Sequence, residues 1–205
     1  LGSCPHEPKP SRVKFELLFY FRFMFIQHRH SYSEPERIYF FTATINSWKH
    51  LLNEDATKNI VISSLQNLNE RKLIQLYAYV IMPNHIHLIW KSLKNNGRES
   101  TQASFLKYTA HEFKKYLKNN MPFELQNYSV DRVNKDYEFW QRDPLNVHLY
   151  SMEVMNQKMD YIHNNPLKEK WKLAAAQEEY RYSSGQFYIS GRDEFNFLTH
   201  IGEAW

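Results

Sequence analysis

Two apolar runs separated by a single Pro-Asn pair constrain the fold of this chain most strongly. The first is LIQLYAYVIM (residues 73–82) and the second is HIHLIWK (residues 85–91). Both are rich in β-branched and aromatic residues and have the length of ordinary strands. Pro83 and Asn84 between them favour a turn. The sequence therefore predicts an antiparallel hairpin of two largely buried strands.

The second of these strands carries two polar rings, His85 and His87. Successive side chains of a strand point to opposite faces, so the two histidines share one face. Ile86, Leu88 and Trp90 share the other face. Two imidazoles fixed side by side are either half of a metal site or incidental polar residues. The strand by itself leaves both interpretations open.

Further elements precede and follow the hairpin. RIYFFTATIN (residues 37–46) predicts a first strand, and residues 54–71 have helical spacing. Residues 94–100 predict a loop, and residues 101–118 a second helix. The apolar positions that give the first helix its period are Ala56, Ile60, Leu65 and Leu68.

The remaining elements lie in the second half of the chain. Residues 119–137 are polar and predict a connecting loop, and residues 138–150 predict a fourth strand bent at Asp143-Pro144. Ser151 is a good N-cap for a third helix, which Pro166 ends.

This order of elements predicts an α+β fold. Strand, helix, strand, strand, helix, strand is the ferredoxin-like split β-α-β pattern with an antiparallel sheet, here followed by an added C-terminal helix. A chain of 205 residues suits one domain. We predict an N-terminal extension (1–37), a main domain (38–190) and a C-terminal tail (191–205). A strand or helix within 1–37 that packs on the domain is the alternative.

Composition limits the classes of function. FELLFYFRFMFI (residues 15–26) is apolar but too short for a membrane span of about 20 residues, so no membrane association is expected. Cys4 is the only cysteine, which excludes an internal disulfide and fits a reducing compartment. The net charge of +4 and the isoelectric point of about 9.0 permit a nucleic-acid partner without requiring one.

The third helix has two distinct sides. At 100° per residue its apolar side, which should pack on the sheet, consists of Met152, Met155, Met159 and Ile162. A separate stripe consists of Val154, Lys158, Tyr161 and Asn165. Tyr161 is therefore not an obvious core residue. Asn165 follows it by four residues, so the two side chains can contact the same ligand. Because Asn165 precedes a proline, it can also hang off the helix end.

These residues together suggest one chemistry. Two histidines and an amide oxygen can hold a divalent cation with open positions, which would polarise a phosphodiester. A tyrosine can attack the phosphorus and form a covalent intermediate. A phenol ionises only near pH 10, so it needs the cation or a base, and the sequence identifies no base.

A basic stripe on the second helix is a second candidate site. Lys107, His111, Lys114 and Lys118 fall within a narrow arc of that helix. The stripe either contacts a phosphate backbone or is a solvated helix face. The sequence favours neither interpretation.

Several segments, in their order along the chain, resemble one known family. YAYVIMPNHIHLIW, FWQRD and YIHNNPLK resemble the HUH single-tyrosine transposases, most closely their REP-associated branch. The segment PNHIHL is similar to the family's His-hydrophobic-His signature, and MDYIHNNPLK is similar to its catalytic helix. YRYSSGQFY (180–188) is similar to a further family segment. The first 37 residues, the 119–137 linker and WKLAAAQEEY depart from the family.

The resemblance implies an activity and its residues. Tyr161 takes the position of the nucleophile, and His85, His87 and Asn165 take those of ligands for Mg²⁺ or Mn²⁺. The family cuts and rejoins single-stranded DNA at imperfect hairpins, leaving a 5′-phosphotyrosine and a free 3′-hydroxyl. Residues expected to contact DNA are Lys107, Lys114, Lys118, Arg142 and Lys158.

Two other functions remain as alternatives. One is a non-catalytic, domesticated hairpin-DNA-binding protein, and the other is an HUH nuclease of the relaxase or replication-initiator type. We expect a bacterial, cytoplasmic, nucleoid-associated protein that is a monomer or homodimer. The sequence does not give the DNA target, the role of residues 1–37, or whether the tyrosine acts in its own subunit or a partner's.

Overall fold

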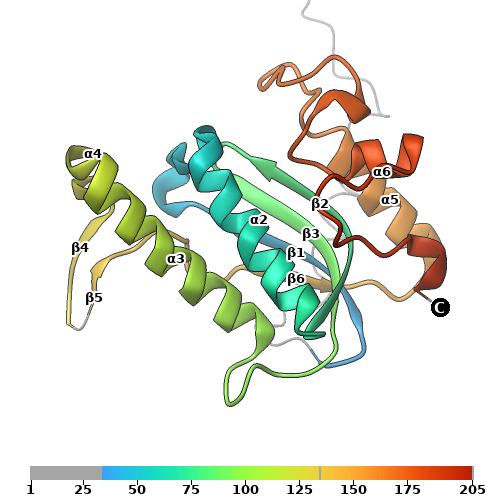
Figure 1. Cartoon of the computed structure of the whole chain (residues 1–205), viewed down its shortest axis with the longest axis horizontal. Coiled ribbons are helices and arrows are strands. Elements are labelled where there is room, and N and C mark those ends of the chain that lie inside the picture. Colours follow the sequence, from blue (N-terminus) through green and yellow to red (C-terminus); the bar gives the residue numbers. More distant parts are fainter. Residues whose placement is uncertain (1–33, 134, 205) are drawn as a thin grey trace, which may run out of the picture.

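The computed structural model describes residues 34–133 and 135–204. Its centre is a four-stranded antiparallel sheet in the order β2-β3-β1-β6 (Figure 1). The strands are β1 (Ile38–Thr44), β2 (Ile74–Met82), β3 (His85–Ser92) and β6 (Leu145–His148). The predicted hairpin is confirmed, since β2 and β3 pair across the turn at Pro83 and Asn84.

Helices cover both faces of this sheet. The α-helices are α2 (Asp55–Glu70), α3 (Thr101–Asn120), α4 (Pro122–Gln126), α5 (Met152–His163) and α6 (Gly185–Ser190). Two short 3₁₀ turns, η1 (Asn46–Trp48) and η2 (Leu51–Asn53), connect β1 to α2. Because β3 lies between β1 and β2, the split β-α-β prediction is confirmed.

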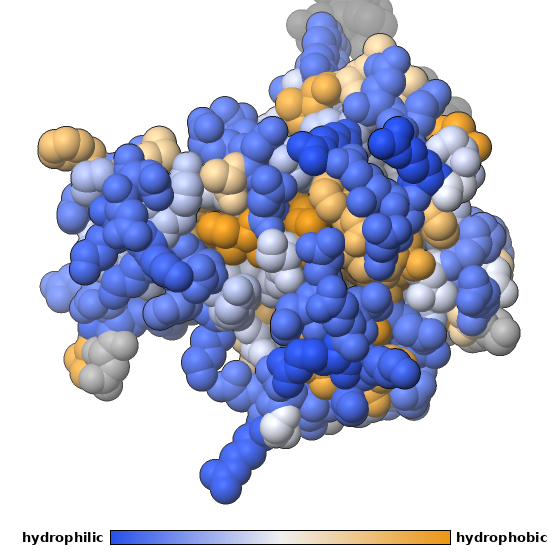
Figure 2. All heavy atoms as spheres, in the orientation of Figure 1, coloured by the Kyte–Doolittle hydropathy of each residue, from blue (hydrophilic) through white to orange (hydrophobic). Residues whose placement is uncertain are grey.

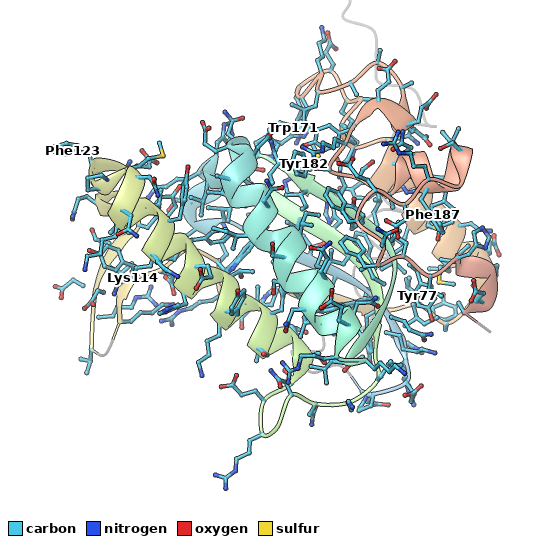
Figure 3. The ribbon with its side chains drawn as sticks, viewed as in Figure 1. Tyr77, Lys114, Phe123, Trp171, Tyr182 and Phe187 are labelled. Carbon is cyan, nitrogen blue, oxygen red and sulfur yellow. The ribbon has the colours of Figure 1, made fainter. Side chains whose placement is uncertain are left out.

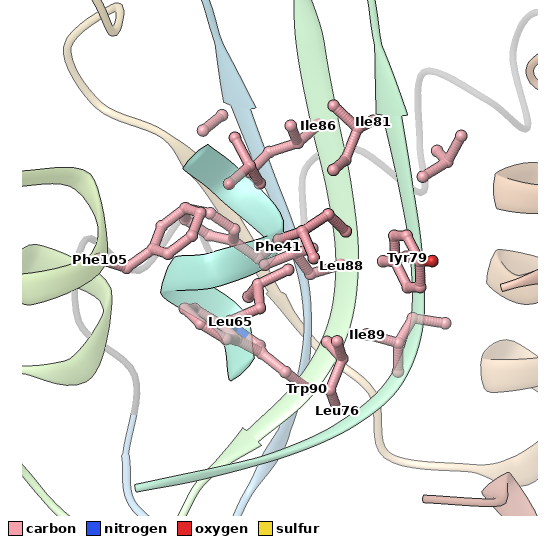
Figure 4. Packing of buried hydrophobic residues seen from close by; sticks show 14 of the residues in the cluster. Phe41, Leu65, Leu76, Tyr79, Ile81, Ile86, Leu88, Ile89, Trp90 and Phe105 are labelled. Carbon is pink, nitrogen blue, oxygen red and sulfur yellow. The ribbon is translucent and has the colours of Figure 1, made fainter. Parts of the chain in front are cut away.

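One face of the sheet carries the main apolar core. Phe41 of β1 and Trp90 of β3 pack with Phe105 of α3, at ring-centroid distances of 5.1 to 6.5 Å. Leu65 of α2 and Leu88 of β3 are also fully buried in this layer (Figure 4). The outer surface of α2 and α3 is mostly hydrophilic (Figure 2). These helices are therefore amphipathic covers of the sheet.

The opposite face is covered by α5. The Ser151 hydroxyl accepts a hydrogen bond from the backbone N–H of Val154, so the predicted N-cap is confirmed. Met155 and Ile162 are fully buried against the sheet, as predicted. The prediction for Met152 is wrong, because this side chain lies in the first turn and is 37% exposed.

The C-terminal segment covers the edge of β2. Backbone N–H groups of Ile81, Ser184 and Thr199 donate to Tyr182, Tyr79 and Leu76, respectively. An unpaired edge strand is an aggregation hazard, and this pairing removes it. Within the segment predicted as a tail (191–205), Phe197 and Ile201 are buried.

The prediction of a plain loop over 119–137 is wrong. This stretch forms α4 and a two-stranded ribbon of β4 (Ser129–Arg132) and β5 (Lys135–Tyr137). Leu125 and Tyr128 are buried and fix the ribbon to the domain. Polar composition concealed the ribbon because its strands are mostly exposed on both faces.

The fourth strand is shorter than predicted. Residues 138–142 form only an isolated bridge between Ile45 and Trp140, and β6 begins at Leu145. Asp143 has a positive φ of 55°, which breaks the extended conformation between them.

Predictions for residues 1–33, including the apolar run 15–26 and Cys4, lie outside the described residues. Within the described ranges, the helices lack the length and apolar character that crossing a bilayer requires.

Candidate active site

The two histidines of β3 lie side by side beneath α5. Their ring centroids are 4.8 Å apart, with the planes at 72° to each other. In the neighbouring strand β1, Thr42 is opposite His87 and Thr44 is opposite His85. Both rings are buried, with 7% of His85 and 5% of His87 exposed. The prediction that they share one face is confirmed.

Hydrogen bonds orient both imidazoles. The Asn84 amide donates to the Trp48 carbonyl oxygen at 3.3 Å, which turns its Oδ1 towards His85 Nδ1 at 2.7 Å. An amide oxygen only accepts, so His85 Nδ1 carries the proton and Nε2 presents its lone pair. The Thr42 hydroxyl lies 2.7 Å from His87 Nδ1. Both partners orient their rings, as is usual for metal-binding histidines, but the Thr42 hydroxyl can donate or accept, so only the tautomer of His85 is fixed.

Burial keeps both histidines neutral. It lowers the pKa of His85 to about 4, with smaller contributions from the nearby Lys170 and Lys168 charges. The pKa of His87 lies well below its ordinary value, mainly through burial and then through His85, Lys168 and Lys158. A neutral imidazole is the form that binds a metal ion.

Tyr161 of α5 projects over the same face. Its ring lies 5.2 Å from that of His87 and 6.1 Å from that of Phe40, both in edge-to-face geometry. The side chain is 37% exposed, unlike the fully buried Met155 and Ile162 of the same helix. The structure thus brings the predicted nucleophile to the histidine pair.

Asn165 lies just beyond the end of α5 and is 2% exposed. Its Oδ1 accepts a hydrogen bond from the Lys168 ammonium at 2.9 Å. Its Nδ2 is buried and has no hydrogen-bond partner among the described residues. A buried amide that is only half satisfied is costly, which suggests a role other than stability.

Lys168 is a site residue that the sequence did not single out. Its Nζ lies 4.1 Å from the centre of the Tyr161 ring, besides its bond to Asn165. Burial, and then the charge of Lys170, lower the pKa of Lys168. Its spacing in the sequence could have indicated this position, since Lys168 follows Asn165 by three residues and Tyr161 by seven. Its nearness to the histidines depends on how the chain folds back after α5.

The residues at this site fit a divalent cation. His87 Nε2 is buried without a hydrogen-bond partner in the described part of the chain, as expected of a nitrogen reserved for a ligand. Among the described residues no three His, Cys, Asp or Glu side chains gather around a metal position. The two imidazoles are the possible ligands that the described residues bring together, and the Asn165 amide oxygen, which accepts from Lys168, stays a predicted third ligand.

The basic stripe of α3 is not part of this site. Phe105 of α3 packs on the sheet face opposite the histidines, so Lys107, Lys114 and Lys118 lie on that side of the molecule. Lys107 pairs with Glu99 at 2.6 Å, and Lys114 with Asp136 at 3.5 Å. Figure 3 shows Lys114 and Trp171 on opposite sides of α2.

Two other predicted DNA contacts lie on the histidine side. The Lys158 ammonium is 5.1 Å from the centre of the Phe40 ring, and its charge lowers the pKa of His87. Arg142 borders a small hollow that Thr42 and Thr44 also line, and its guanidinium lies 3.4 Å from Glu138. Both are therefore placed where a DNA strand at the histidines could pass.

Fold and site together define a ferredoxin-like domain with a tyrosine-bearing helix laid across a histidine pair. No protein-family profile and no curated protein sequence matches the chain. Among solved structures, it is similar to a REP-associated tyrosine transposase bound to a REP hairpin, with a TM-score of 0.56 and 15% identity. This match covers 86% of the chain and 93% of that protein.

A second structure is a candidate transposase from Deinococcus radiodurans R1. It matches with a TM-score of 0.36 and 14% identity, over 68% of this chain and 97% of that one. The first similarity establishes that the chain has the fold of a REP-associated tyrosine transposase, in agreement with the resemblance of its motifs.

Proposed function

We propose that this protein is a metal-dependent transposase of single-stranded DNA, with Tyr161 as nucleophile. The observation that carries the proposal is the position of Tyr161, partly exposed and 5.2 Å from the buried His87 ring. A purely structural tyrosine on α5 would be expected to be fully buried, as Met155 and Ile162 are, whereas Tyr161 is 37% exposed. The unsatisfied His87 Nε2 beneath it supports a bound ion at the same place.

The proposed reaction is a transesterification. The Tyr161 phenol loses its proton to water as its oxygen attacks the phosphorus of a phosphodiester, forming a phosphotyrosine bond to the 5′ side. The bond from phosphorus to the 3′ oxygen breaks, and the 3′ oxygen leaves and takes up a proton as a hydroxyl. Because the phosphoester energy is kept in the phosphotyrosine, attack by another 3′-hydroxyl rejoins DNA without an external energy source.

His85, His87 and Asn165 would hold Mg²⁺ or Mn²⁺, which would polarise a phosphate oxygen. The chain itself supplies orientation and charge. Asn84 and Thr42 orient the imidazoles through their Nδ1 atoms, and burial keeps the rings neutral. The Lys168 ammonium, 4.1 Å from the Tyr161 ring centre, favours negative charge developing near the phenol and at the phosphate.

The proposed substrate is a hairpin in single-stranded DNA of a bacterial chromosome. The similar transposase was solved with a REP hairpin, and 93% of it is covered by this chain. Lys158 and Arg142, on the side of the histidines, are the cations best placed to contact the strand that enters the site. Action in the cytoplasm follows from this substrate.

The test is covalent trapping of DNA. Labelled single-stranded hairpins from the genomic flanks of the gene are incubated with Mn²⁺ and separated on a denaturing gel. The wild type should give a slow-migrating adduct, and Tyr161→Phe should give none while still binding the hairpin. Tyr150→Phe is the matched control, because Tyr150 is exposed, precedes α5 and should not affect the adduct.

Two results would contradict the proposal. An adduct that persists in Tyr161→Phe means that another residue attacks. Hairpin binding by the wild type without any adduct favours the non-catalytic DNA-binding alternative.

A further inference from the structure

An exposed tryptophan stands at the edge of the histidine pair. Trp48 is 59% exposed, although tryptophan is usually largely buried. Its ring lies 6.5 Å from the His85 ring in edge-to-face geometry. A large flat apolar surface is thus presented to solvent next to the proposed reaction centre.

The backbone that presents this ring is strained. Ser47 and Trp48 both have left-handed conformations, with φ of 56° and 57°, although neither is glycine. Non-glycine residues adopt this region at a cost, and they persist there only when their surroundings hold them. Here the Trp48 N–H donates to the Ile45 carbonyl oxygen at 2.9 Å.

Asn84 ties this strained turn to the histidine. Its Nδ2 donates to the Trp48 carbonyl oxygen, and its Oδ1 accepts from His85 Nδ1. A single side chain therefore fixes both the Trp48 backbone and the His85 ring. Any group held by the His85 imidazole meets the indole in a defined relative orientation.

A second indole lies at His85. The Trp171 ring is 6.0 Å from that of His85, and its Nε1 is buried without a hydrogen-bond acceptor in the described part of the chain. The Lys170 ammonium lies 5.0 Å from the Trp171 ring centre. The cations Lys170 and Lys168 are both close enough to lower the pKa of His85. Two indole rings and two ammonium groups therefore lie around this histidine.

We propose that Trp48, with Trp171, forms a subsite for an unpaired nucleobase next to the phosphate held at the histidines. Trp48 provides the stacking surface, and the indole N–H of Trp171, which has no acceptor among the described residues, would donate to a polar atom of the base. Flat rings beside lysines match the bases and phosphates of a single strand. This inference rests on the proposed function, since it assigns a base-binding role beside that site.

The experiment separates bases from phosphates. Affinity is measured by fluorescence anisotropy, without metal, for a labelled oligo(dT) and for an abasic oligonucleotide of the same length. Stacking tolerates any base, so no specific target is needed. The wild type should bind oligo(dT) more tightly. Trp48→Ala should weaken oligo(dT) binding about 5- to 150-fold, the equivalent of 1–3 kcal/mol, and leave abasic binding unchanged.

Two further variants complete the set. Trp48→Phe keeps a flat ring and should retain most of the preference for oligo(dT). Phe123→Ala removes another exposed aromatic ring, 91% exposed on α4 and well separated from Trp171 in Figure 3, and should leave both affinities unchanged. Unfolding of each variant by urea checks that the fold is intact.

Three outcomes overturn the subsite: equal binding of both oligonucleotides by the wild type, no effect of Trp48→Ala, or an equal loss for both oligonucleotides. Covalent trapping distinguishes this failure from failure of the proposed function. A wild type that forms the Tyr161 adduct but shows no preference for bases lacks only the subsite. A base preference that depends on Trp48, without an adduct, supports the subsite and contradicts the catalytic proposal.

Discussion

The two faces of the central sheet are built on different principles. On the side of α2 and α3, fully buried side chains such as Phe41, Leu88 and Phe105 form the main core. Buried polar atoms on this side that no described residue satisfies belong to Gln102 of α3 and Asn146 of β6, and they are not grouped with a tyrosine or a histidine pair. On the side of α5, burial includes His87 and Asn165, each with a polar atom that no described residue satisfies. The same strands, β1 and β3, form both surfaces, because their side chains alternate.

This difference separates stability from function. Burying apolar groups stabilises a fold, while burying polar groups without partners costs free energy. The first face is therefore expected to supply most of the stability. On the second face the unsatisfied polar groups of His87 and Asn165 gather around Tyr161 and Lys168, which is typical of sites prepared for a ligand. Four experiments test this contrast.

The largest expected effect is on the apolar face. Phe105→Ala removes a fully buried ring that contacts Phe41 and Trp90, so it should lower the free energy of unfolding by about 3–5 kcal/mol. Tyr161→Phe on the other face should change it by no more than about 0.5 kcal/mol. Urea unfolding followed by circular dichroism measures both. If both variants lost a similar free energy of unfolding, the two faces would not differ in their contribution to stability.

The second effect is stabilisation by metal. Mn²⁺ at 100 times its dissociation constant should stabilise the wild type by about 2.7 kcal/mol, and Mg²⁺ should require higher concentrations. His87→Leu should abolish this stabilisation because it removes the unsatisfied Nε2. His111→Ala is the control, since His111 is exposed on α3. Thermal unfolding with and without metal measures this stabilisation. If Mn²⁺ stabilises His87→Leu as much as the wild type, the predicted ligand set is excluded.

The third effect is a dependence of stability on pH. Burial lowers the pKa of His163 to about 4, and its Nε2 lies 2.8 Å from the Ser184 hydroxyl. A histidine held neutral in the fold contributes stability above pH 6.5, which is lost as the pH falls towards 4. His163→Gln should therefore remove up to ~3 kcal/mol of the difference in stability between pH 7 and pH 4. An unchanged pH profile of this variant would refute a buried neutral His163.

The smallest effect concerns the charges on the two faces. Lys158→Gln, on the histidine side, should reduce the slope of log binding constant against log salt for hairpin DNA by about 1. Lys107→Gln should leave the slope unchanged, because Lys107 is paired with Glu99 on the other face. A reduced slope for Lys107→Gln would instead identify the α3 stripe as a phosphate-binding surface.

Local patterns predicted most of the elements. The hairpin at Pro83 and Asn84, the cap at Ser151 and the helices over 54–71 and 101–118 were each encoded by nearby residues. Where exposed strands lack an apolar face, as in β4 and β5, periodicity gave no signal and the prediction was wrong.

The candidate site was predictable only in part. His85 and His87 share a face because strand geometry requires it, and the stripe of α5 separates Tyr161 from the buried methionine Met155. The approach of Lys168 and the two indoles to this site was not predictable. Each comes from a connection outside the regular strands and helices, where no periodicity fixes the direction of a side chain.

The sequence by itself thus determined the elements, the sheet pattern and the pairing of two histidines on one face, because these follow from contacts between near neighbours along the chain. Only the tertiary structure decided which elements meet. It laid Tyr161 over His87 and turned the α3 lysines to the far side of the sheet. It also strained Trp48 beside His85. The reason is physical: long-range placement depends on how both faces of one sheet are covered at once, and no local stretch of sequence contains that information.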